Sequence, residues 1–83
     1  MHAAAVEYDL HIPTARSLKA KRAVVRPIVE GLRQRCSVSA AEVAHHDQWQ
    51  RAVVAIAAVA STHAHLCELL DGADRFVWSH PEV

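Results

Sequence analysis

The residue types that could support chemistry in this 83-residue chain concentrate in two segments, a basic block and a histidine-containing cluster. The basic block, residues 16–35, holds seven of the nine lysines and arginines: Arg16, Lys19, Lys21, Arg22, Arg26, Arg33 and Arg35. Glu30 is its one carboxylate, so the block carries a charge of +6 within a chain of net charge zero. Positive side chains gathered without matching carboxylates are typical of a surface that meets phosphate.

The second segment, residues 42–51, reads EVAHHDQWQR and contains several side chains of metal-ligand type. These are Glu42, His45, His46 and Asp47. Adjacent histidines in a strand or loop usually point apart, so a zinc site would need further ligands such as His11 or His63. We therefore predict no metal site, and a zinc titration would test this.

The same segment has a simpler structural interpretation. Glu42, Asp47, Trp49 and Gln50 are expected to belong to a structured connection between two strands. In this interpretation Trp49 packs over the sheet and Gln50 binds exposed backbone groups. A functional role for this loop stays open at this point.

Catalysis has little support in the sequence. It contains no Gly-rich phosphate loop, Ser-His-Asp arrangement or Cys-His signature. Cys36 and Cys67 fit neither a disulfide scaffold nor a four-ligand zinc site, and we expect both to be small buried hydrophobes. Glu42 could be a buried catalytic carboxylate, but burial alone is weak evidence. We predict a protein that is not an enzyme and has no cofactor.

The elements that position the basic block follow from periodicity. Residues 6–12 alternate strictly between apolar and polar side chains, which predicts a half-buried strand. Ser17 can then cap a helix that begins at Leu18. Pro27 removes one hydrogen bond, but it lies away from the apolar side, so we expect the helix to bend and continue.

On this helix the two kinds of side chain separate into sectors. The apolar sector contains Leu18, Val25, Ile28, Val29 and Leu32. Lys19, Arg22, Arg26 and Arg33 form a separate stripe about 60° wide. Lys21 is different because it projects into the apolar sector, either to extend its ammonium to water or to aim it at a ligand.

The rest of the chain contains two further strands and a second helix. Residues 36–43 alternate again, and residues 51–60 are apolar on both faces, as expected at the centre of a sheet. Residues 66–77 have helical spacing, with Ser61 or Thr62 as the N-cap. The second face of residues 51–60 has no obvious cover, which predicts a homodimer interface formed by Val53, Ala55, Ala57 and Val59.

The resulting order is strand, helix, strand, strand, helix within one domain, residues 1–83. We predict an α+β, ferredoxin-like βαββα(β) sandwich, an antiparallel sheet with two helices on one face. Its fourth strand is missing or truncated, which would leave residues 6–12 as an open edge. The longest apolar run, residues 52–60, is far shorter than the roughly 20 residues of a membrane helix, so no membrane association is expected.

Three stretches carry a resemblance to a known family. IPTARSLKAKRAVVRPIVEGLRQR, VSAAEV and DQWQRAVVAIAAVAS, in this order, resemble the YlxP-like family of small bacterial proteins of unassigned function. Family genes often lie beside those for a translation initiation factor and a ribosome-binding factor, so the resemblance implies a cytoplasmic, translation-linked protein. The chain departs from the family at Cys36, where a bulky aromatic is usual, and at Ala4, where glycine is common. Members also continue into a fourth strand, whereas the sequence here stops at Val83.

Two functions follow as expectations. The first is binding of ribosomal RNA or the ribosome through Arg16, Lys19, Lys21, Arg22, Arg26 and Arg33. No aromatic residue lies among these charges in the sequence, which favours backbone contact over base stacking. The alternative is a homodimeric protein-interaction module that does not bind nucleic acid.

Overall fold

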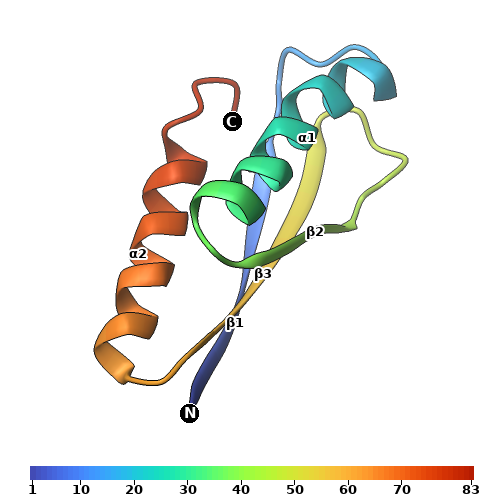
Figure 1. The fold of residues 1–83 in the computed structure, drawn as a ribbon. Helices are drawn as coiled ribbons and strands as arrows, with labels where there is room; N and C mark the ends of the chain where they lie inside the picture. Colours follow the sequence, from blue (N-terminus) through green and yellow to red (C-terminus); the bar gives the residue numbers. More distant parts are fainter.

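The computed structural model describes residues 1–83 and contains three strands and two helices (Figure 1). In chain order they are β1 (His2–His11), α1 (Leu18–Arg35), β2 (Ser39–Ala44), β3 (Arg51–Ala60) and α2 (His63–Trp78). The expected order of elements and the α+β class are confirmed. Neither helix combines the length and the apolar character that crossing a membrane requires.

The sheet is antiparallel, with the strand order β1-β3-β2. β1 pairs with β3 along its whole length, from His2 opposite Ala60 to His11 opposite Arg51. β2 pairs with the other side of β3, and its register shifts between Glu42 and Ala44. The apolar strand β3 is therefore central, as its sequence predicts. This arrangement is that of a ferredoxin-like sheet without its fourth strand.

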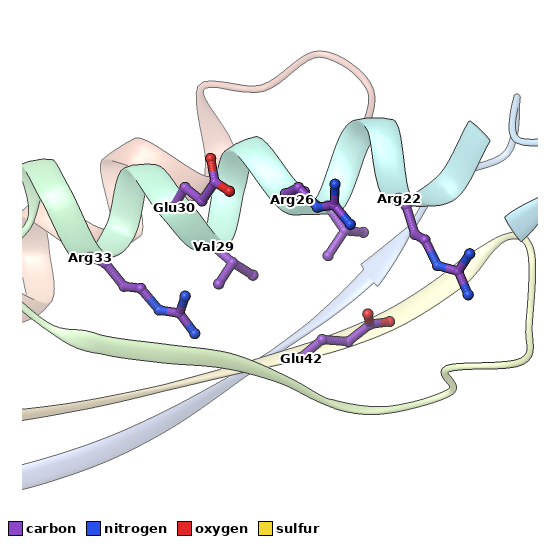
Figure 2. Close-up of a pocket in the computed structure, with 7 residues that line it drawn as sticks. Arg22, Arg26, Val29, Glu30, Arg33 and Glu42 are labelled. Atoms are coloured by element: carbon purple, nitrogen blue, oxygen red, sulfur yellow. The ribbon is translucent and has the colours of Figure 1, made fainter. Parts of the chain in front are cut away.

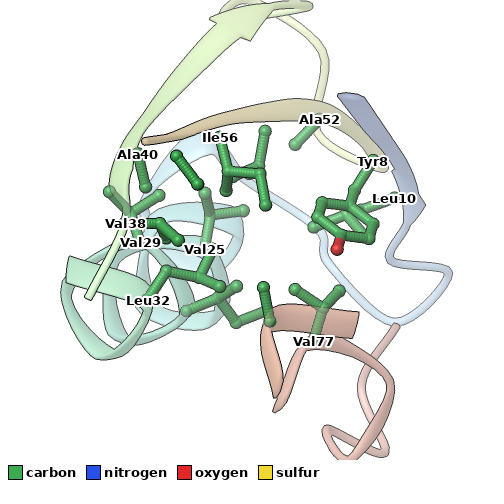
Figure 3. Close-up of a cluster of buried hydrophobic side chains, with 14 of the residues drawn as sticks. Tyr8, Leu10, Val25, Val29, Leu32, Val38, Ala40, Ala52, Ile56 and Val77 are labelled. Atoms are coloured by element: carbon green, nitrogen blue, oxygen red, sulfur yellow. The ribbon is translucent and has the colours of Figure 1, made fainter. Parts of the chain in front are cut away.

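The core lies between one face of the sheet and both helices (Figure 3). Alternate residues of the strands, among them Leu10 and Ile56, meet Ile28 and Leu32 of α1 and Val77 of α2, and all five are at most 2% exposed. Burial of apolar area in this layer supplies the main stabilisation of a domain of this size. Placing both helices on one face leaves the other face of the sheet without a helix.

Side-chain oxygens cap both helices as the sequence predicts. The Ser17 hydroxyl accepts a hydrogen bond from the Ala20 amide at 3.0 Å, and the Thr62 hydroxyl accepts one from the His65 amide at 3.1 Å. Thr62, rather than Ser61, is thus the cap of α2. α1 continues through Pro27, which is exposed.

Two strand boundaries differ from the sequence expectation. β1 begins at His2 rather than residue 6, because pairing with the end of β3 extends an alanine-rich segment that has no alternation of its own. β2 begins at Ser39 rather than residue 36. Cys36 is the C-cap of α1, and Ser37 has a left-handed φ of 56° that turns the chain out of the helix before the strand begins.

Candidate nucleic-acid interface

The basic side chains of α1 lie over edge strand β2. Arg22, Arg26 and Arg33 line a shallow groove of about 280 Å³ between the helix and the strand, together with Glu30 and Glu42 (Figure 2). All three arginines are exposed. The stripe that helical periodicity predicts is thus confirmed as one continuous surface.

A second hollow extends this surface along the outer side of α1. Lys19, Arg22 and Arg26 line it with Pro27 and Glu30. We call the exposed set of Arg16, Lys19, Arg22, Arg26 and Arg33 the basic surface. Glu30 is the one acidic residue of α1 and forms no ion pair.

No side chain of the basic surface forms an ion pair with a carboxylate, although Glu30 and Glu42 line the same groove. The three ion pairs of the molecule are Lys21–Glu42, Arg51–Asp9 and His65–Glu68. Arg33 donates a hydrogen bond from Nε to the Ala40 carbonyl at 2.9 Å, which fixes its side chain over β2 but leaves its charge uncompensated. These guanidinium and ammonium groups are therefore free to bind an anion in solution.

Lys21 does not belong to the basic surface. Its side chain is 1% exposed, and its ammonium donates to four oxygens: Glu42 Oε2 at 3.1 Å and the carbonyls of His45, His46 and Arg51 at 2.7, 3.3 and 3.2 Å. The expectation that Lys21 contacts RNA is therefore corrected, because a buried ammonium with this many partners cannot reach a phosphate. The ammonium of Lys21 also does not extend to water. Its hydrogen bonds stabilise the β2–β3 connection instead.

That connection is a rigid turn. His45 has a left-handed φ of 62°, and its carbonyl accepts a hydrogen bond from the Gln48 amide at 3.0 Å as well as from Lys21. At the other end the Gln50 carbonyl accepts from the Ile12 amide at 2.8 Å. The expected role of Gln50 is confirmed, since its side-chain amide donates to the carbonyls of Pro13 and Ala15 at 3.1 and 3.3 Å.

Trp49 lies between these fixed points but does not pack over the sheet. Its side chain is 52% exposed, so the expected packing is wrong. It lines an open hollow together with Arg16, Asp47, Gln48 and Gln50. Sequence reasoning missed this neighbourhood because Arg16 precedes α1 whereas Trp49 follows β2, and only the fold brings them together.

The histidine-containing cluster does not assemble into a metal cage. No group of three or more His, Cys, Asp or Glu side chains is placed to hold an ion. A ring nitrogen of His45 instead contacts the Gln48 amide nitrogen at 3.1 Å, and one of His46 lies 3.2 Å from the Glu42 carbonyl oxygen. Both histidine rings therefore make contacts within the β2–β3 connection.

Comparison with known proteins places the chain in a family. Residues 3–83 match the model of a family described as a protein of unknown function, DUF503. The chain is 36% identical over 77 residues to the uncharacterized protein YlxP of Bacillus subtilis (strain 168), covering 93% of this chain and 84% of the relative. The chain belongs to the DUF503 family. Its resemblance to YlxP-like proteins is thereby confirmed.

In this DUF503 protein the groups with shifted pKa values lie away from the basic surface. Burial, reinforced by the nearby negative charge of Asp74, raises the pKa of Tyr8 to about 12. Burial also raises the pKa of the Cys36 thiol, against the opposing effect of Arg35. Neither side chain lines the hollows along α1 or the one beside Trp49, so these shifts stabilise neutral forms away from that surface. Cys36 is only partly buried and Cys67 is exposed, so the expectation that both cysteines are buried is wrong.

The DUF503 chain also has an uncovered apolar sheet face, opposite the helices. Among the residues predicted to form an interface, Val59 is 63% exposed and Ala57 is exposed, whereas Ala55 is partly buried and Val53 is only 9% exposed. Val43 of β2, 47% exposed, adds to the apolar side chains at the surface. The structure thus leaves uncovered the half of β3 that contains Ala57 and Val59, which we call the open half of β3. Val53, by contrast, is buried within the chain.

Proposed function

We propose that this DUF503 protein is a cytoplasmic, translation-linked accessory protein that binds ribosomal RNA or the ribosome through the basic surface. The observation that carries the proposal is the set of five exposed cations along and before α1, none of which has a carboxylate partner. Unpaired, solvent-exposed Lys and Arg on one face bind phosphate oxygens by charge-assisted hydrogen bonds.

The spacing of these charges suits a nucleic-acid backbone better than a single small anion. Lys19, Arg22, Arg26 and Arg33 extend over four turns of α1, about 20 Å at 1.5 Å per residue. A single phosphate would require them to converge, whereas a helix of RNA presents phosphates in a row. Contact with the backbone positions the RNA and carries no sequence preference by itself.

A salt titration with one matched pair of variants tests the proposal. The double change Arg22→Gln, Arg26→Gln removes two positive charges from the basic surface, and neither side chain makes a hydrogen bond within the molecule that would be lost. The control Arg75→Glu on α2 changes the net charge by the same amount outside the hollows of α1. The probe is a labelled RNA hairpin.

The parent is expected to lose affinity steeply between about 50 and 200 mM salt. Each phosphate contact contributes roughly 0.7 to 0.9 to the steepness of the fall of log affinity with log salt, so the double variant should lower that steepness by about 1.4 to 1.8. Arg75→Glu should leave it unchanged. Equal slopes for the parent and the double variant, or binding that salt does not weaken, would contradict the proposal.

A second candidate function is that of a homodimeric interaction module, favoured by the open half of β3. The observation that supports this second function is the exposure of Val59, Ala57 and Val43 on a sheet face that no helix covers. Association through apolar area is weakened little by salt. The salt dependence of binding therefore separates the two functions.

A further inference from the structure

The hollow around Trp49 extends the basic surface beyond the start of α1. Arg16 belongs both to the basic surface and to the lining of this hollow, so the charges along the helix continue to an aromatic ring. An exposed tryptophan beside a positive groove is the combination with which proteins bind unpaired bases, because every base has a face that can stack.

The ring is presented on a backbone that is fixed from both sides. Gln48 donates its amide to the His45 carbonyl, and Gln50 is tied to the β1–α1 loop by its carbonyl and by its side chain. The buried ammonium of Lys21 stabilises the turn by donating hydrogen bonds to the carbonyls of His45, His46 and Arg51. A backbone that is already held by hydrogen bonds does not need to be ordered when a ligand binds, which lowers the entropic cost of binding.

The remaining groups in the hollow suit a base rather than a phosphate. Asp47 lines the hollow together with Arg16, so the hollow carries one negative and one positive charge and has no excess positive charge to attract a second phosphate. Its carboxylate accepts hydrogen bonds from amino or imino groups of a base, and the Gln48 amide can both donate and accept. The hollow can thus offer a base both stacking on the indole of Trp49 and hydrogen bonds to the edge of the base.

We propose that Trp49 is a stacking platform for one unpaired base of the RNA whose phosphates lie along α1. This inference rests on the proposed function and specifies its ligand: a structured RNA that carries an unpaired nucleotide next to its helix. The duplex backbone lies over Arg22 and Arg26, and the unpaired base turns onto the indole beside Arg16.

Two RNA hairpins with the same stem test this assignment. One carries a single-stranded tail of uridines, and the other a tail of the same length made of abasic nucleotides, which has the same phosphates but no bases. Trp49 is made the sole tryptophan by Trp78→Phe, since Trp78 is also half exposed. The uridine tail should bind more tightly and quench the indole fluorescence, whereas the abasic tail should do neither.

Trp49→Ala should lower affinity for the uridine tail by about 5- to 150-fold and remove the preference between the two RNAs. Trp49→Phe should keep most of that preference, while Arg22→Gln, Arg26→Gln should weaken both RNAs alike. Equal binding of the two tails by the parent, or a preference that survives Trp49→Ala, overturns the inference and leaves the proposed function standing. If the parent binds neither hairpin, the inference and the proposed function are both overturned. If anionic vesicles quench the indole fluorescence and neither RNA does, the surface binds a membrane instead.

Discussion

At the scale of single residues, Lys21 is the basic side chain whose role the fold changes most. It lies two residues after Lys19, yet the helix turns it inward, where it is 1% exposed. A buried ammonium is tolerated because Glu42 compensates its charge and three carbonyls share its two remaining protons. Two of those carbonyls belong to the turn that presents Trp49, so a core lysine positions a surface tryptophan.

Replacing Lys21 with Met should therefore destabilise the protein and loosen the turn. The change leaves Glu42 without its ionic partner and removes one donor from each of three carbonyls, and we expect a loss of about 2 to 4 kcal/mol in the free energy of unfolding. Urea denaturation measures the loss, and amide hydrogen exchange at Gln48 and Gln50 should become faster. Lys19→Met is the control: the same change on an exposed residue of α1 should alter stability by less than about 0.5 kcal/mol. Equal stability of the two variants would show that the ammonium does not hold the turn.

At the scale of elements, local sequence patterns explain why much of the molecule could be predicted. Residues 51–60 form a central strand with the predicted bounds because a continuous apolar run suits a strand that is covered on both sides by neighbours, and the arginine stripe of α1 is a surface because its spacing follows the helical period. The start of β1 at His2 and the surroundings of Trp49 could not be predicted. They depend on partners from distant segments: β3 for the alanines of β1, and Arg16, which precedes α1, for the ring of Trp49.

The packing of α1 against α2 can be tested through two glycines with opposite surroundings. A Cβ on Gly31 of α1 would overlap the ring of Phe76 of α2, so Gly31→Ala must displace that ring. A Cβ on Gly72 would meet nothing within 4 Å. Gly72→Ala should therefore add roughly 0.5 to 1 kcal/mol of stability through helix propensity.

For Gly31→Ala the overpacking cost of about 1 to 3 kcal/mol should exceed the same gain in propensity, giving a net loss. The midpoints of urea denaturation for the two variants should move in opposite directions from that of the parent. A stabilised Gly31→Ala would mean that the ring of Phe76 moves aside at little cost, and that its packing on Gly31 does not hold the two helices together.

At the scale of the whole molecule, the two proposed surfaces lie on opposite sides of the domain. The basic surface belongs to the helical layer, whereas the open half of β3 belongs to the bare face of the sheet. On that bare face the register places Glu7 opposite Ala55 and Asp9 opposite Val53, and Asp9 is paired with Arg51. The face therefore offers RNA no cluster of unpaired positive charges. A dimer through the sheet would leave both basic surfaces free, and the two functions are therefore compatible.

The register also selects the variant that tests a dimer. Ala55→Glu would place a second carboxylate opposite Glu7 within one chain and would destabilise the monomer. Ala57 lies opposite Ala5 on one side and Ser39 on the other, so no charge lies directly opposite a glutamate there, and Glu7 is only its diagonal neighbour. Ala57 is also exposed, at the open half of β3. Ala57→Glu is the sharper change, and Ala57→Ser is its uncharged control.

If the bare face is a two-fold interface, the parent should have a mass by light scattering that rises with concentration from 9.1 kDa toward twice that value. Ala57→Glu should raise the dissociation constant by at least about 100-fold, because its carboxylate would be buried near its symmetry mate without a partner. Ala57→Ser should dimerise nearly as well as the parent, since it keeps the small volume that lets two sheets approach. A mass of 9.1 kDa at every concentration, or a dimer that Ala57→Glu leaves intact, would remove the sheet face as a site of self-association.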